Sequence, residues 1–65
     1  MKELRSFRES LNLSPAQFAE KLGISKSLYE KVEGGFRPAS RNFVERLKTR
    51  YPQFDTNIFF ITSNH

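Results

Sequence analysis

The chain has 65 residues, a formal net charge of +4 and no cysteine. Its length allows one domain with one small core, and the lack of cysteine excludes disulfides, thiolate metal sites and cysteine nucleophiles. The charged N-terminal segment is followed by no long apolar run, so we expect no secretion signal, no membrane span and a cytoplasmic location.

Apolar residues recur at helical spacing along the chain, and no strand-like alternation is found. The pattern therefore predicts an all-α fold of five helices. The first helix is expected at about residues 2–11, with Leu4, Phe7 and Leu11 on one face. Asn12 is expected to end it in a left-handed conformation, because asparagine tolerates positive φ.

Residues 14–35 predict two short helices joined by a sharp turn. Ser14 and Gln17 form the pattern of a capping box, and Pro15 suits the first helical position. Gly23 is expected to end the first helix in a left-handed conformation, and Ser25 to cap the second. The first helix has one apolar face, formed by Phe18, Ala19 and Leu22.

The second helix of this pair has an apolar face carrying Tyr29 and Val32, and Gly34 and Gly35 are expected to end it. Its opposite face is polar and basic. A helix held by a tight turn, with long hydrogen-bond donors facing outward, fits the major groove of DNA. The outward residues are Lys26, Ser27 and Lys31.

Two further helices are predicted after the glycines. Ser40 is expected to cap the first, and Pro52 to end it. Asp55 or Thr56 is expected to cap a last short helix, and residues 62–65 to fray. The inward stripe of the longer helix consists of Phe43, Val44, Leu47 and Tyr51.

The segment 14–35 resembles the helix-turn-helix of the Cro/CI-type (XRE) family of DNA-binding proteins. The tail at residues 55–62 is similar to the family's Asn-x-x-Trp-Leu-Leu-Thr ending. The motif positions that match are Leu13, Ser14, Phe18, Ala19, Leu22, Gly23, Ile24, Ser25, Val32, Glu33 and Gly35.

The resemblance implies a five-helix, lambda-repressor-like domain over residues 1–65. It further implies a bacterial or phage transcriptional repressor that binds an inverted-repeat operator in double-stranded DNA as a homodimer, without catalysis, cofactor or metal. Small autoregulators of phages and mobile elements are members of this kind. Two alternatives stay open: an antitoxin that binds both its toxin and DNA, and an interaction module that has lost DNA binding.

Four residues of the second helix are expected to face the bases. Lys26, Ser27 and Lys31 would donate to base edges, the alternative being ordinary solvated surface. Leu28 could touch a thymine methyl group or complete the edge of the core.

Contacts to the DNA backbone are expected from Gln17, Gly34, Arg37, Ser40 and Arg41. Residues 26–50 carry seven basic against three acidic side chains, which places positive potential on this half of the chain. Two features weaken the expected phosphate contacts. The residue at 15 is Pro, where the family usually has a Gln that bonds phosphate, and at Gly34 only a backbone amide is offered.

Arg8 and Glu33 could suggest an active-site pair. The resemblance instead implies a structural ion pair that holds the first helix against the end of the third. No nucleophile–base pair or metal site can be assembled elsewhere, because the only histidine is His65 at the end of the chain.

The aromatic residues of the first four helices fall on inward stripes, so core packing explains them better than stacking on single-stranded nucleic acid. The run Ile58, Phe59, Phe60 and Ile61 differs, because four large apolar residues in one turn cannot all face one core. At least one of them is therefore expected to be exposed, and Phe59 and Phe60 are the residues expected to form an exposed patch. The resemblance implies a dimer interface at this helix. In an antitoxin, the same patch would meet the toxin, and an antirepressor is a further possible partner.

Overall fold

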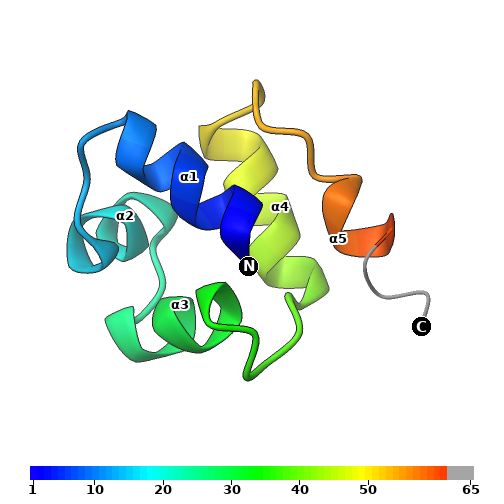
Figure 1. The fold of residues 1–65 in the computed structure, drawn as a ribbon, viewed down its shortest axis with the longest axis horizontal. Coiled ribbons are helices and arrows are strands. Elements are labelled where there is room, and N and C mark those ends of the chain that lie inside the picture. The colour runs from blue at the N-terminus through cyan, green and yellow to red at the C-terminus, as the bar shows by residue number, and fades with distance from the viewer. Residues whose placement is uncertain (62–65) are drawn as a thin grey trace.

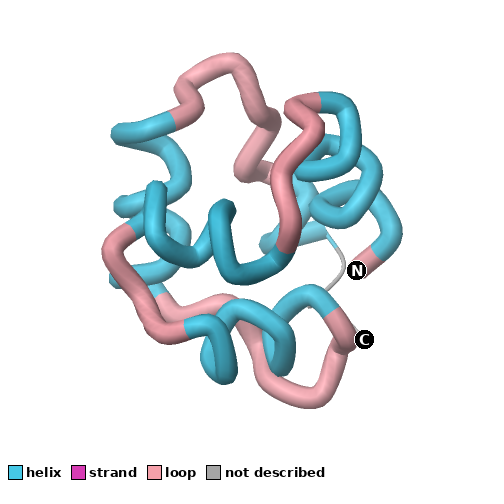
Figure 2. The backbone as a smooth tube through the Cα atoms, turned by 90° about the vertical axis from the view of Figure 1, so that its left-hand side faces the viewer, coloured by secondary structure: helices cyan, strands magenta, loops and turns pink. Residues whose placement is uncertain are grey.

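The structure is a computed structural model that describes residues 1–61, with only the backbone of Ile61. Its described part contains five helices joined by loops and no strand, as Figure 2 shows, which confirms the expected all-α fold. The predicted boundaries of the first four helices agree with the observed ones to within about a residue, whereas the last helix begins at Ile58, one or two residues later than a cap at Asp55 or Thr56 predicts. The helices are α1 (Lys2–Ser10), α2 (Pro15–Leu22), α3 (Lys26–Glu33), α4 (Arg41–Arg50) and α5 (Ile58–Ile61).

Serine caps fix the starts of α2, α3 and α4. The Ser14 hydroxyl accepts a hydrogen bond from the Gln17 N–H at 3.2 Å, and the Gln17 side-chain oxygen accepts one from the Ser14 N–H at 2.8 Å. Ser25 and Ser40 each accept a hydrogen bond from the N–H three residues later, both at 3.1 Å. All three predicted serine caps are therefore confirmed, and each satisfies a donor that a helix start leaves unpaired.

The turn between α2 and α3 depends on Gly23, whose φ of +72° is unfavourable for any residue with a Cβ atom. Asn12, with φ of +59°, forms the predicted left-handed turn after α1. Arg46 of α4 donates a hydrogen bond to the Leu22 carbonyl at 3.2 Å. Its guanidinium lies 2.7 Å from the place of a Cβ atom at Gly23, so the glycine also lets Arg46 hold the end of α2.

The core is rich in aromatic rings. Phe18 stacks on Tyr51 with ring centroids 5.3 Å apart and meets the edge of Tyr29 at 5.1 Å. Because these rings are buried, they are not free to stack on single-stranded nucleic acid, and the core interpretation is confirmed. The fully buried side chains are Leu4, Phe18, Tyr29, Phe43 and Leu47.

The helices place α3 at one edge of the molecule and α5 at another. In Figure 1, α2 and α3 lie at the left and lower edge, and α5 lies at the right beyond α4. The loop between α3 and α4 reaches the lowest point of that view. The surface of α3 and the surface of α5 can therefore contact different partners.

The expectation that Phe59 and Phe60 are both exposed is wrong for Phe59. Its side chain is only 8% exposed, and its ring lies 6.1 Å from the rings of Phe43 and Phe54. Phe60 is 59% exposed. Successive helical residues point about 100° apart, so a single turn that buries Phe59 directs its neighbour elsewhere.

The other residues of the predicted dimer surface are only partly described. Ile58 is half-buried against the core. The side chain of Ile61, and the predicted fraying of residues 62–65 with His65, lie outside the described residues.

Candidate nucleic-acid interface

Helix α3 has one buried and one exposed face. Tyr29 and Val32 lie in the core, whereas Lys26, Ser27 and Lys31 are all exposed. The structure thus brings the three predicted base-contacting polar residues to one solvent-facing surface of a single helix. Leu28, the fourth, is half-buried and packs against the edge of the core, so only part of its side chain is open to a ligand.

An acidic side chain that sequence analysis did not single out lies on the same helix. The Glu30 carboxylate is 3.9 Å from the Lys26 ammonium group, one turn away, and both side chains are about half exposed. Exposed pairs of this kind contribute little to stability, so a ligand that binds Lys26 can displace Glu30.

The α3–α4 loop uses its backbone amides to close the end of α3. The Gly34 N–H donates to the Glu30 carbonyl at 2.9 Å. The N–H groups of Phe36 and Arg37 both donate to the Lys31 carbonyl, at 2.9 and 3.2 Å. The expectation that the Gly34 amide contacts phosphate is therefore wrong, because a helical hydrogen bond already occupies that donor. This loop can contact a ligand mainly through its side chains.

Several exposed donors surround the start of α4. Ser40 accepts the capping hydrogen bond, which leaves its O–H free to donate, and the side chains of Arg37 and Arg41 are exposed. Within residues 1–61, the N–H groups of Arg41 and Asn42 enter no hydrogen bond, as is usual in a first helical turn. Sequence analysis did not name the Asn42 amide, because only its position two residues after the Ser40 cap indicates that its N–H group is left without a helical partner.

Gln17, the remaining predicted backbone contact, is exposed on α2. Its side-chain oxygen is engaged in the capping box with Ser14, so its NH₂ group is the part left to donate.

Arg8 and Glu33 meet, as the resemblance implied. The Arg8 Nε donates to Glu33 Oε1 at 2.9 Å, and both side chains are about one-tenth exposed. The Tyr29 hydroxyl donates to the same oxygen at 2.7 Å, and a second Arg8 nitrogen donates to the Leu13 carbonyl at 2.8 Å. Sequence analysis placed Tyr29 in the core but did not anticipate this bond. The cluster connects α1, the turn after it, and α3.

The charges of this cluster are fixed by its surroundings. Burial raises the pKa of the Tyr29 hydroxyl far above its usual value, and the hydrogen bond to Glu33 raises it further. Burial also tends to raise the pKa of Glu33, but the hydrogen bonds from Arg8 and Tyr29 outweigh it, and the pKa lies below its usual value. A neutral Tyr29 beside an ionised Glu33 that accepts two hydrogen bonds is a structural arrangement, which fixes the orientation of α3.

The profile of the helix-turn-helix domain family matches residues 2–51. The chain belongs to the helix-turn-helix domain family. This confirms the resemblance drawn from the motif, and the match covers α1 to α4. No curated protein and no solved structure with which the chain was compared matches it. Membership implies DNA binding and a role in the regulation of transcription, and it is typical of proteins that are not enzymes.

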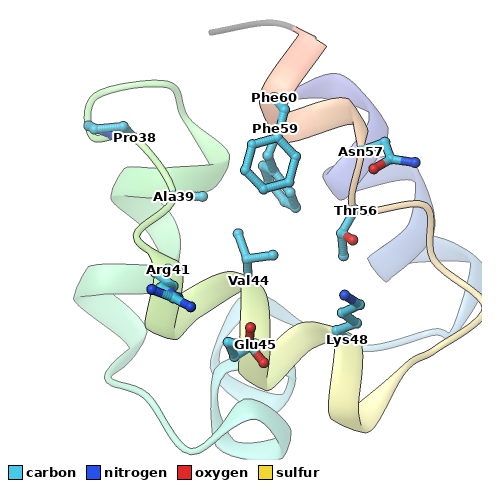
Figure 3. Close-up of a pocket in the computed structure, with 10 residues that line it drawn as sticks. All are labelled: Pro38, Ala39, Arg41, Val44, Glu45, Lys48, Thr56, Asn57, Phe59 and Phe60. Atoms are coloured by element: carbon cyan, nitrogen blue, oxygen red, sulfur yellow. The ribbon is translucent and has the colours of Figure 1, made fainter.

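A groove borders the helix-turn-helix domain on the side of α5. Its volume is about 630 Å³, and it lies between the loop before α4, α4 itself and α5 (Figure 3). Val44 of α4 faces the ring of Phe59, and Phe60 lies at the α5 side of the opening. The charged residues along its α4 side are Arg41, Glu45 and Lys48.

Two other kinds of site are absent from the part of the chain that the structure describes. Among residues 1–61, no three histidine, cysteine or acidic side chains lie close enough together to hold a metal ion. Nor is any helix of this described part both long and apolar enough to cross a membrane.

Proposed function

We propose that this helix-turn-helix domain is a sequence-specific transcriptional repressor that places α3 in the major groove of its operator. The observation that carries the proposal is the shared exposed surface of Lys26, Ser27 and Lys31 on α3. Behind that surface, the buried Arg8–Glu33 pair holds the helix in a fixed orientation. A helix that is rigidly held and carries donors on its outer face can match the donor and acceptor pattern of base pairs.

The proposed contacts divide into two groups. Lys31 and Ser27 read base edges, since lysine donates to guanine O6 and N7 and serine suits several bases. Arg37, Arg41 and the first amides of α4 bind phosphates, which sets the position of the domain without reading sequence. The exposed cations of the loop and α4 support this division.

We further propose a homodimer formed through α5. Phe60 is exposed beside the apolar part of the groove, so a two-fold axis can bring each Phe60 to the groove of the other copy. In Figure 1, α5 lies to the right and α3 below, and a copy added on the right by a vertical two-fold axis presents its α3 downward as well.

The size of the domain supports such an arrangement. Its longest dimension is 30 Å, which is comparable with one turn of B-DNA, about 34 Å. The operator is then an inverted repeat with half-site centres about 10–10.5 base pairs apart.

The groove also supports a second candidate function, that of an antitoxin. In that case a toxin, and not a second copy, covers Phe60. Co-purification of a different chain in fixed ratio would favour the antitoxin. An interaction module without DNA binding is less well supported, because it gives no reason for the exposed cations of α3 and of the loop after it.

The division of contacts can be tested with two alanine variants. A duplex selected from a random-sequence pool serves as the specific site. Lys31→Ala should weaken binding to it by about 1–3 kcal/mol and leave binding to random DNA nearly unchanged. Arg37→Ala should weaken both and reduce the slope of log affinity against log salt concentration by about one. Fluorescence anisotropy at several salt concentrations measures all four quantities.

Lys48→Ala is the matched control, because it also removes one exposed charge but lies along the groove. Its affinity for both kinds of DNA and its salt slope should be nearly those of the unchanged protein. The division is wrong if Lys31→Ala and Arg37→Ala lose the same affinity for both kinds of DNA.

A further inference from the structure

The most exposed large apolar side chain that the structure describes is Phe36, at 87% exposure. It takes no part in the core, and sequence analysis assigned it no role. Leaving a phenylalanine in water is unfavourable, so a partner that covers this ring would bind more tightly for doing so.

The position of Phe36 links it to the proposed DNA surface. It lies between α3 and Arg37, and its N–H group is bonded to the Lys31 carbonyl, so the loop is tied to the end of α3. This loop projects on the same side of the molecule as α3 (Figure 1). Glu33, the charged residue before it in the chain, is buried and paired with Arg8. The nearest exposed charges along the chain, Lys31 and Arg37, are both cations, and this favours a polyanion as the partner.

The lack of a side chain at Gly34 leaves room for the Phe36 ring. A Cβ atom at position 34 would lie 3.0 Å from two carbons of the ring, Cδ2 and Cε2. The φ of Gly34 is −78°, which other residues adopt easily, so the backbone conformation does not require glycine here. What the glycine provides is space, and the ring rests against the end of α3 instead of extending freely.

From these observations we infer that Phe36 packs against deoxyribose groups of the DNA backbone, beside the phosphates that Arg37 contacts. This inference rests on the proposed function. The sugars are the apolar part of the backbone, and a loop that follows the recognition helix lies along the backbone and not over the bases. Such a contact adds affinity that depends on neither sequence nor salt. It strengthens a surface where Pro15 and the occupied Gly34 amide provide no phosphate donor.

The test compares Phe36→Ala with Phe60→Ala on a duplex that contains a single selected half-site. Phe36→Ala should bind about tenfold more weakly to this duplex and to random DNA, with an unchanged salt slope. Phe60→Ala, which also truncates an exposed phenylalanine, should bind a half-site as the unchanged protein does. The melting temperature of Phe36→Ala should not fall, because the side chain contributes nothing to the core.

Gly34→Ala tests the place of the ring independently. The added methyl group should displace the ring and weaken DNA binding in the unchanged protein, but have little further effect in the Phe36→Ala background. This non-additivity is the sign of a shared contact.

Three results for Phe36→Ala would overturn the inference. The first is an affinity equal to that of the unchanged protein, and the second is a reduced salt slope. The third is a loss of affinity that occurs only for duplexes that carry thymine at one particular position. The last would assign Phe36 to base recognition. If the unchanged protein binds no duplex at all, the proposed function itself fails, and this outcome is distinct from the other three.

Discussion

Glu33→Gln is expected to lower the free energy of unfolding by about 3 kcal/mol. The carboxylate of Glu33 accepts hydrogen bonds from Arg8 at 2.9 Å and Tyr29 at 2.7 Å in a site that water barely reaches. Replacing it leaves the Arg8 guanidinium buried without a counter-charge, and an unpaired buried charge is costly. In a domain of this size, where 1 kcal/mol shifts the melting temperature by about 4–8 °C, the effect is easily measured by circular dichroism.

Glu30→Gln is the matched control for this experiment. It makes the same chemical change on the same helix, one turn earlier, at an exposed carboxylate that lies 3.9 Å from the Lys26 ammonium group. Its melting temperature should change little. DNA binding by Glu33→Gln should weaken only to the extent that the domain unfolds. An unchanged melting temperature together with abolished binding would make Glu33 a direct DNA contact and contradict its structural role.

The pH dependence of stability follows from the same pair. The pKa of Glu33 is lower in the folded protein than in the unfolded chain, so ionised Glu33 stabilises the fold above the unfolded value of about 4.3. This contribution is lost as the pH falls through the lower folded value. In Glu33→Gln this part of the acid sensitivity should be absent.

Phe60→Glu is expected to give a folded monomer that binds the full operator about 10²–10⁴-fold more weakly than the dimer does. The substitution would place a carboxylate from each copy in the apolar contact between the two copies, where burying a charge is unfavourable. Binding to a single half-site should stay the same, because α3 is untouched. Sedimentation equilibrium and binding to full and half operators measure the two effects.

Gln53→Glu provides the control, since it adds the same charge at an exposed position of the loop before α5. A dimeric Phe60→Glu protein, or a monomeric one with undiminished affinity for the full operator, would contradict the dimer proposal. Phe59→Glu does not serve this purpose, because Phe59 lies in the core and a charge there would unfold the domain.

Local chemistry explains why much of the fold could be predicted from sequence. The Ser14, Ser25 and Ser40 caps and the turns at Asn12 and Gly23 depend on residues within a few positions of one another. Such short-range signals are carried by single residue types. The inward stripes of α1 to α4 follow from the helical period in the same way.

What could not be predicted depends on contacts between distant segments or on the direction of a short element. The hydrogen bond from Arg46 to the Leu22 carbonyl joins residues 24 positions apart. A helix of one turn has no period, so the sequence could not tell that Phe59 is buried and Phe60 exposed. Loop side chains follow no period either, which is why Phe36 was not singled out.

The central claim, that α3 and the loop after it form the DNA-binding surface, can be tested most directly by nuclear magnetic resonance. The amide signals of the ¹⁵N-labelled protein are followed while the selected duplex is added. We expect the largest changes at residues 26–31 and 36–42, with little change at Asn57 and Lys48 beside the groove. Changes concentrated on the α5 side of the groove, with α3 unaffected, would contradict the account.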